Sequence, residues 1–235
     1  VFVAVGAHQT IGLGIIGEDG PRILGGTNFL REINLGKEIK LGNRVAIIGG
    51  GNTAMDSART AIRLGAREVT IVYRRTRIEM PASSEEIEAA IEEGVEFLFL
   101  AAPSQITNLD GELGLECFRM KLGAEDSSGR RRPEPITDSE FTLNLDNIIA
   151  AIGQRPVVPA SFNLATERGD KIQVDPDTLA TGNKAIFAGG DAVSGPATVI
   201  EAIAAGKQAA ISIDKYLGGS GLIEEILAPP EQIMD

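Results

Sequence analysis

A short apolar run that ends in three consecutive glycines constrains the fold of this chain more than any other stretch. Val45–Ile48 is entirely apolar, and Gly49–Gly51 follows it directly. Small and apolar residues then recur with helical spacing over Asn52–Leu64, and a second β-branched run follows at Val69–Val72. This order of strand, glycine turn, helix and strand predicts a βαβ unit with the dinucleotide-binding fingerprint Gly-x-Gly-x-x-Ala.

The small residues of the fingerprint each have a physical reason. Gly49 permits a sharp turn out of the strand, and Gly51, which lacks a Cβ, lets a diphosphate approach the backbone. Ala54 is small enough for the helix to lie close to the strand, and the first N–H groups of the helix face the phosphates. The residues expected to bind the dinucleotide are Gly49, Gly50, Gly51, Asn52, Thr53 and Ala54. The alternative is a glycine-rich turn that binds no ligand.

The residue at the end of the second strand decides which dinucleotide is preferred. An acidic residue there holds the ribose 2′-hydroxyl of NAD, whereas an arginine accommodates the 2′-phosphate of NADP. Arg74 and Arg75 occur about twenty residues after the fingerprint, and Arg77 lies just beyond them. We therefore predict NADP(H), with Arg74 as the stronger candidate because side chains alternate along a strand. For Arg75 and Arg77 a solvated surface cluster is an equal alternative.

The charge balance and the cysteine count exclude several classes of function. The 235 residues carry a net charge of −11, which argues against nucleic acid or an anionic membrane surface as a partner. Cys117 is the single cysteine, so no internal disulfide and no redox Cys-x-x-Cys pair can form. Neither a signal peptide nor an apolar run of about eighteen residues is visible. We expect a soluble protein in a reducing, cytoplasmic setting.

The segment ahead of the central strand is rich in glycine and is predicted to be mostly loop. Gly12–Gly17 matches the fingerprint as a string, but Glu18–Pro21 follows where a helix would be required. Val1–Val5 is predicted to be a strand, and apolar residues over 29–33 indicate a short helix.

The residues after the second strand continue the α/β pattern and then change to an antiparallel one. Ser83 and Glu86 form a capping-box pattern that predicts the start of a helix, and an apolar strand follows it. Residues 104–145 alternate loosely between apolar and polar, which predicts an antiparallel β excursion. Its polar middle holds Arg130–Arg132, which we interpret as a charged loop tip, with contact to an acidic partner as the alternative. A last apolar strand ends at Gly153, whose backbone we expect to pass close to the cofactor.

A second strand end with glycines occurs near the end of the chain. Residues 185–188 form a short apolar run that leads through Gly190 to Asp191. A helix is predicted from Thr198, with Glu201 completing its capping box. Asp191 is a candidate acceptor for the hydroxyl groups of a ligand, and an aspartate that caps its own turn is an equal alternative.

Taken together, these segments resemble one known family. The chain resembles the pyridine-nucleotide-dependent flavoprotein oxidoreductases of the glutamate synthase small-subunit type, within the pyridine nucleotide-disulfide oxidoreductase superfamily. The matching segments are Val45–Asp56, Val69–Arg75, Glu79–Ala82, Ala151–Pro156, Ile186–Asp191 and Gly195–Ala202.

The resemblance implies an α/β fold with a Rossmann-like NAD(P)-binding domain inserted into a partial FAD-binding domain. On this basis residues 42–152 form the NADPH domain, and residues 1–41 and 153–235 are parts of the FAD domain. The family has a first glycine fingerprint that binds the FAD diphosphate. It would precede residue 1, and this sequence does not supply it. We therefore expect the chain to be a truncated version that binds FAD poorly by itself.

The resemblance also implies roles for residues near the end of the chain and a reaction. Gly190 and Asp191 would contact FAD, the carboxylate binding the ribityl chain, and the backbone at Thr198 and Val199 would face the flavin O2 edge. Hydride would pass between NADPH and FAD, and electrons would be exchanged with an iron–sulfur partner such as a glutamate synthase large subunit. We expect no catalytic side chain and no metal ligand in this chain.

Two other functions compete with this one. The first is a non-catalytic nucleotide-binding or interaction module that is inactive as an isolated fragment. The second is a dehydrogenase that passes hydride directly to a small substrate. For this last function the chain would need a proton-transferring group, and His8, Tyr73 and Tyr216 offer no such constellation.

Overall fold

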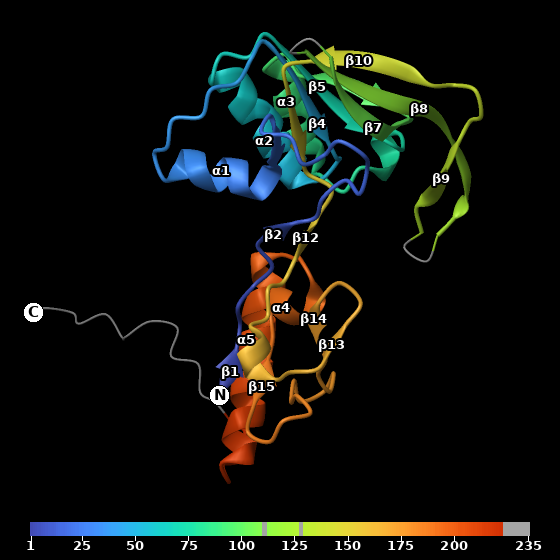
Figure 1. Cartoon of the computed structure of the whole chain (residues 1–235). Helices are drawn as coiled ribbons and strands as arrows, with labels where there is room; N and C mark the ends of the chain where they lie inside the picture. Colours follow the sequence, from blue (N-terminus) through green and yellow to red (C-terminus); the bar gives the residue numbers. More distant parts are fainter. Residues whose placement is uncertain (110–111, 127–128, 223–235) are drawn as a thin grey trace, which may run out of the picture. The chain divides into compact units, whose positions relative to one another are not determined.

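The computed structural model describes residues 1–109, 112–126 and 129–222, and the chain forms two compact units. The larger unit is Gln9–Gln154, and the smaller one combines Val1–His8 with the residues from Arg155 onward. In the sequence the larger unit is therefore inserted into the smaller one, which confirms the predicted insertion. Figure 1 shows the elements of both units coloured along the chain.

The larger unit is built on a parallel sheet of five strands, with the order β3-β11-β4-β5-β6. All four neighbouring pairs run parallel. The strands are β3 (Ile23–Gly25), β11 (Asn147–Ala150), β4 (Arg44–Ile48), β5 (Glu68–Tyr73) and β6 (Glu96–Phe99). Because β4 leads through α2 (Asn52–Arg63) into β5, the predicted βαβ unit is confirmed. Gly65, with φ +99°, follows the end of that helix, where the left-handed conformation favours glycine.

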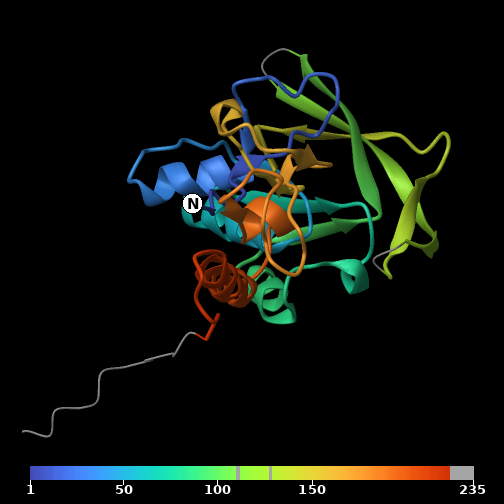
Figure 2. The same cartoon turned by 90° about the horizontal axis from the view of Figure 1, so that it is seen from below.

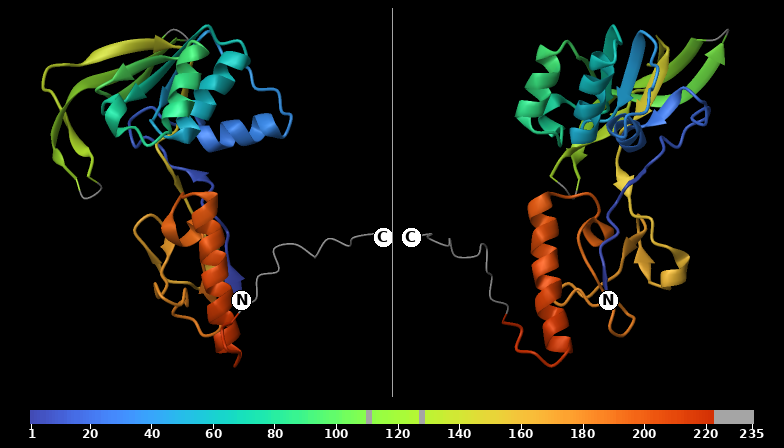
Figure 3. Two further views of the ribbon diagram at one scale, coloured as in Figure 1. Left: turned by 180° about the vertical axis from the view of Figure 1, so that it is seen from behind. Right: turned by 90° about the vertical axis from the view of Figure 1, so that its left-hand side faces the viewer.

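Three layers form the larger unit. Helices α1 (Gly26–Asn34), α2 and α3 (Ser84–Glu92) cover one face of the parallel sheet (Figure 3). Val45 and Ile47 of β4 point into this side, where they are fully buried together with Ala54 and Ala58 of α2. A one-turn 3₁₀ helix, η1 (Arg77–Glu79), lies between β5 and α3 in the sequence.

An antiparallel sheet covers the other face. It consists of β7 (Ala101–Leu109), β8 (Glu112–Glu125), β9 (Arg131–Pro135) and β10 (Phe141–Leu145), as the alternation predicted. Ala46 and Ile48 of β4 point to this side and are buried with Leu115 and Cys117 of β8. Burial raises the pKa of the Cys117 thiol to about 12, so this cysteine is a core residue without reactivity. Figure 2 shows the β8–β9 hairpin extending beyond the parallel sheet.

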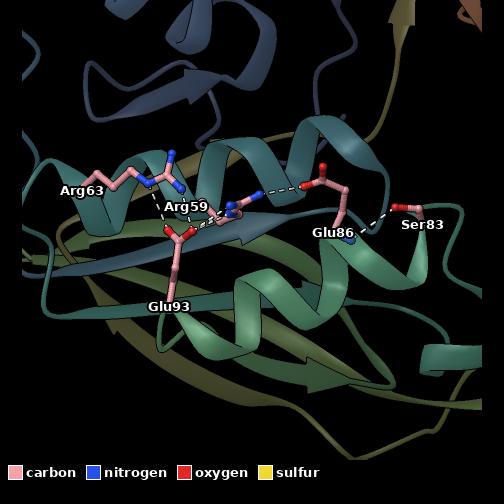
Figure 4. A network of polar contacts seen from close by, with 5 residues as sticks. All are labelled: Arg59, Arg63, Ser83, Glu86 and Glu93. Atoms are coloured by element: carbon pink, nitrogen blue, oxygen red, sulfur yellow. Dashed lines mark hydrogen bonds and ion pairs between the residues drawn. The ribbon is translucent and has the colours of Figure 1, made fainter.

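Ion pairs join α2 to α3 on the surface of the larger unit (Figure 4). Arg59 lies 2.9 Å from the Glu86 carboxylate and 2.8 Å from that of Glu93, and Arg63 also pairs with Glu93. The hydroxyl of Ser83 accepts the Glu86 N–H at 3.2 Å, so the predicted helix start is confirmed. The Glu86 side chain, however, reaches across to Arg59, so only half of the predicted capping box forms.

The structure differs from the expected boundary at residue 41. Residues 9–41 were assigned to the flanking domain, but they lie in the larger unit with the parallel sheet. The reason is strand pairing over a long distance, because β3 adds to the sheet beside β11 and α1 packs against α2. At the ends of the unit β2 (Gln9–Thr10) pairs with β12 (Gln154–Arg155).

The smaller unit has short strands and two helices. Here β1 (Phe2–Val3) pairs in parallel with β15 (Phe187–Ala188), and β13 (Thr166–Glu167) forms a hairpin with β14 (Lys171–Ile172). The remaining elements are η2 (Ala160–Phe162), α4 (Asp191–Ser194) and α5 (Val199–Tyr216). Its core cluster has four buried residues, Val3, Ile172, Ala188 and Ala192. Within the described residues, no helix has both the length and the apolar character that a membrane span requires.

Candidate dinucleotide-binding site

The turn between β4 and α2 can be made only by glycine at its first position. Gly49 has φ +147°, and a Cβ on this residue would overlap the carbonyl oxygen of Ala151 at the end of β11. Its N–H donates to the carbonyl oxygen of Val72 at 3.1 Å. The turn is therefore tied to both strands that flank β4.

The second glycine lies against an aromatic ring. A Cβ on Gly50 would come within 2.6 Å of the ring of Tyr73, the last residue of β5. The Tyr73 hydroxyl donates to the carbonyl oxygen of Glu79 at 2.7 Å, and the Ala82 N–H donates to that of Gly50 at 3.2 Å. Residues 77–82 thus form a support beside the glycine turn, which we call the η1 support.

A buried carboxylate stabilises this η1 support. Glu79 accepts hydrogen bonds from the backbone N–H of Thr76 at 3.1 Å and from its hydroxyl at 2.6 Å. These bonds, first of all the one from the hydroxyl, lower the pKa of Glu79. The carboxylate is therefore charged at neutral pH and holds η1 in place as half of a capping box.

The third glycine faces open space. Among the described residues, the nearest atom to a Cβ on Gly51 would be Cγ of Pro81, at 3.7 Å, so none of them requires a glycine there. Gly51 is the N-cap of α2, and no side chain of the described residues caps the start of this helix. Among the described residues, the N–H groups of Asn52 and Thr53 have no partner. Free helix N–H groups beside a missing side chain leave room for a phosphate group and supply its hydrogen bonds.

These residues lie where ligands bind in sheets of this type. The chain continues from β4 to β5 on one side and reaches β11 on the other, so the strand order reverses at β4. In open α/β sheets, ligands bind beyond the carboxyl ends of the strands at such a switch point. Gly153, with φ +143°, follows β11 at this edge, and the Gln154 side chain donates to the Thr53 hydroxyl at 3.4 Å. The larger unit therefore brings Gly153 beside the start of α2.

The two arginines at the end of β5 point in opposite directions. Arg74 is exposed, and no side chain among the described residues pairs with its guanidinium. Arg75 is 5% exposed, and its guanidinium donates to Asp126 at 2.8 Å and to the carbonyl oxygen of Arg131 at 2.7 Å. The solvated cluster that was an alternative for Arg75 is therefore wrong, because this side chain is buried in an ion pair.

The candidate residues of the smaller unit form a separate group. Asp191 is the first residue of α4, and its carboxylate accepts the Ala197 N–H at 3.2 Å. Gly190 precedes it with φ +63°. The Thr198 N–H, expected to face a ligand, donates instead to the Glu201 carboxylate at 2.8 Å, because the capping box forms. Val199 is exposed and begins α5.

Reasoning from the sequence missed three residues that shape the glycine turn. Tyr73 supports Gly50, Glu79 fixes the η1 support, and Gln154 reaches Thr53. A signal for Glu79 existed, because Thr76 and Glu79 have the spacing of a capping box. The contacts of Tyr73 and Gln154 depend on how the strands pair and leave no local signal.

The fold and the site define a class of protein: an α/β protein with a dinucleotide-binding βαβ unit at the switch point of a parallel sheet. More particularly, the chain belongs to the pyridine nucleotide-disulphide oxidoreductase family, whose model matches residues 1–206. This family and the α/β fold agree with the resemblance and the fold class predicted from the sequence.

Individual relatives are longer than this chain. The chain is 47% identical over 224 residues to the NADP(+)-dependent formate dehydrogenase subunit beta of Moorella thermoacetica, covering 92% of this chain and 31% of the relative. It is 37% identical over 232 residues to the glutamate synthase [NADPH] small chain of Azospirillum brasilense, covering 92% and 48%. The chain thus spans between about a third and a half of these two relatives.

Among solved structures, the fold is similar to that of FprA from Mycobacterium tuberculosis in complex with NADPH. The TM-score is 0.76 at 21% identity, covering 93% of this chain and 63% of FprA. The thioredoxin reductase of T. acidophilum matches with a TM-score of 0.66 at 20% identity, covering 93% of this chain and 65% of that protein. At these identities the likeness concerns the fold alone.

Proposed function

We propose that this chain is the NADP(H)-binding portion of a flavin-dependent oxidoreductase. The larger unit binds the dinucleotide, and the complete protein transfers hydride between NADPH and FAD. When bound, the nicotinamide supplies the hydride and the flavin accepts it. The residues of this chain bind and orient the nucleotide, so their contribution is position rather than bond chemistry.

The observation that carries the proposal is the open space at Gly51. Gly49 and Gly50 are glycines because a Cβ would overlap or crowd protein atoms, whereas a Cβ on Gly51 would meet no atom of the described residues closer than 3.7 Å. The free N–H groups of Asn52 and Thr53 lie at the same place and favour an anionic group. A diphosphate accounts for both features, and it is the group that the fingerprint binds.

The preference for NADP(H) over NAD(H) rests on Arg74. Its side chain is exposed at the carboxyl end of β5, the neighbour of β4 on the side where the ribose of a bound dinucleotide lies. A guanidinium suits a phosphate because it offers several donors in one plane. The names of the relatives in Moorella and Azospirillum include NADP(+) and NADPH and thus support this preference.

The smaller unit is the candidate for the flavin contacts. Gly190 and Asp191 follow β15, and Val199 offers a backbone N–H at the start of α5. Asp191 already accepts the Ala197 N–H through one oxygen, so its other lone pairs remain for the ribityl hydroxyls. The Thr198 N–H serves Glu201, so Val199 is the stronger candidate for the flavin O2 edge.

Electron exchange with an iron–sulfur partner, such as a glutamate synthase large subunit, is part of this proposal. The NADPH-Fe(3+) oxidoreductase subunit beta of Geobacter sulfurreducens, 38% identical over 262 residues, is by its name one subunit of an oxidoreductase, which supports a partner subunit. We also propose a cytoplasmic location for the protein.

A second candidate is a nucleotide-binding module that is inactive by itself. The observation in its favour is the exposed apolar surface of α5, where Val199, Ile200 and Ile203 face solvent.

One titration separates these functions. We expect calorimetry of the purified chain to give saturable binding of NADPH and weaker binding of NADH. Flavin absorbance in the same sample then distinguishes a flavoprotein, which is yellow, from a colourless nucleotide-binding module. If the chain binds neither nucleotide, both candidate functions are rejected.

A further inference from the structure

Arg75 belongs to the sequence pair that suggests a phosphate site, yet its side chain points away from solvent. Tyr73 at the end of β5 is buried, and of the two residues that follow it Arg74 is exposed and Arg75 is buried. One arginine of the pair is thus placed to meet a ligand, and the other points into the protein.

The buried guanidinium joins two distant segments. Its Nη2 donates to the Asp126 carboxylate at 2.8 Å and its Nε to the carbonyl oxygen of Arg131 at 2.7 Å. These two acceptors lie on either side of the β8–β9 turn, 51 and 56 residues away in the sequence. The Arg75 carbonyl oxygen also accepts the Leu100 N–H at 3.1 Å. Three hydrogen bonds therefore fix Arg75 against the β8–β9 hairpin and against the connection between β6 and β7.

The residues close to Arg74 on both sides are also held by hydrogen bonds. Before it, the Tyr73 hydroxyl is bonded to Glu79, and after it the Thr76 N–H and hydroxyl are bonded to the Glu79 carboxylate. The long, flexible side chain of Arg74 therefore starts from a fixed Cα. An arginine that starts from a fixed backbone loses less entropy when it binds a phosphate.

We propose that buried Arg75 and partly exposed Asp126 form an ion pair that positions Arg74 for the 2′-phosphate of NADP(H). Neither residue touches the nucleotide, and both determine the preference for NADPH over NADH. Asp126, on a hairpin outside the βαβ unit, thereby becomes a positioning residue of the nucleotide site. This inference rests on the proposed function, because it takes the dinucleotide to bind at Gly51 and Arg74.

The alternative is that Arg75 swings out and binds the phosphate itself. The two arrangements predict opposite effects on NADPH binding when the carboxylate of Asp126 is removed. If the ion pair positions Arg74, removing the carboxylate of Asp126 weakens the preference for NADPH. If Arg75 is itself the ligand, the same change frees its guanidinium from a competing anion and strengthens NADPH binding.

The experiment compares Arg75→Gln, Asp126→Asn and the double variant with the unaltered chain. Glu134→Gln is the matched control, because Glu134 is a carboxylate on the same hairpin in an exposed ion pair with Lys121. Dissociation constants for NADPH and for NADH are measured by calorimetry for every protein, and thermal unfolding is recorded for each.

Each single substitution is expected to lower the ratio of NADPH to NADH affinity roughly fivefold or more, through NADPH alone. The double variant should lose no more than either single one, because partners in one ion pair are not additive. Asp126→Glu should keep most of the preference, and Glu134→Gln all of it.

Tighter NADPH binding by Asp126→Asn would overturn the proposal, and so would equal losses for both nucleotides, which would indicate a purely structural pair. An unchanged ratio in both single variants would overturn it as well. If Arg74→Gln abolishes the preference while these variants keep it, only this inference fails. If the unaltered chain binds neither nucleotide, the proposed function fails with it.

Discussion

The two units of this chain bury their apolar residues to very different extents. In the larger unit, β4 sends Val45 and Ile47 into one core and Ala46 and Ile48 into another, so its parallel sheet is covered on both faces. The smaller unit has a core cluster of four buried residues. Its long helix α5 buries Ala209 and leaves Val199, Ile200 and Ile203 exposed.

This difference separates what each unit can do by itself. The glycine turn and Arg74 are held by elements of the larger unit, whose core is complete on both faces of the sheet. Asp191 and Val199 belong to a unit with little apolar burial, and a site needs rigid support to hold its groups in place. We therefore expect nucleotide binding to depend on the larger unit and flavin binding to be weak in this chain.

The largest effect expected concerns the two cores. Ile47→Ala removes a fully buried side chain from the centre of the sheet and should lower the free energy of unfolding by about 2–5 kcal/mol. Ile200→Ala, at a site that is 78% exposed, should change it by no more than about 0.5 kcal/mol. Urea unfolding measures both, and similar losses would show that α5 is covered in solution.

The next effect concerns the choice of nucleotide. Arg74→Asp replaces a guanidinium that is expected to bind the 2′-phosphate, and should weaken NADPH by about 1.5–3 kcal/mol more than NADH. Calorimetric titration of one protein with both nucleotides provides the internal control. Equal losses would reject the role of Arg74.

A comparable change in stability is expected where α2 meets the sheet. Ala54 is fully buried, and Ala54→Leu should push the helix away from β4 at a cost of about 1–3 kcal/mol. Nucleotide binding should weaken as well, because the start of α2 moves. A melting temperature equal to that of the unaltered chain would contradict this close packing.

Two glycines of one turn should respond differently. Gly51 has φ −97° and ψ −179°, which alanine adopts readily, and its Cβ would meet open space. Gly51→Ala should therefore keep its stability within about 0.5 kcal/mol but lose roughly tenfold or more in nucleotide affinity. Gly49→Ala should unfold more easily, since Gly49 has φ +147°. Unimpaired binding by Gly51→Ala would argue against a phosphate at this position.

The smallest effect is a dependence of stability on pH. The hydrogen bonds from Thr76 lower the pKa of Glu79 in the folded state. Their contribution to the free energy of unfolding is therefore present above the pKa of the unfolded state, about 4.3, and is lost as the pH falls through the pKa of the folded state. Thr76→Val should reduce this loss. Urea unfolding at several acidic pH values measures it, and identical profiles for the two proteins would disprove the contribution of Thr76.

The sequence predicted the βαβ unit well because its signals are local. The apolar run of β4, the glycines and the helical spacing of α2 lie next to one another in the chain. The antiparallel strands β8 and β10 were predicted for the same reason, from their alternation. Strand β3, with three residues, was missed because its place beside β11 depends on a pairing over more than a hundred residues.

For the candidate site, the sequence identified the residues better than their partners. It favoured Arg74 over Arg75 from strand alternation, but nothing local indicated that Asp126 neutralises Arg75. It identified the capping box of Thr198 and Glu201. It did not indicate that the Thr198 N–H then donates to Glu201 and cannot also face a ligand. Conformations set by local chemistry are thus readable from the chain, whereas contacts between distant segments are not.

The most direct test of the central claim is a titration of the ¹⁵N-labelled chain with NADPH, followed by NMR of the backbone amides. If a diphosphate binds at the start of α2, the amide signals of Gly51, Asn52 and Thr53 should shift most, in proportion to saturation. Saturation that leaves these three signals in place, or that shifts only signals remote from this turn, would contradict the account.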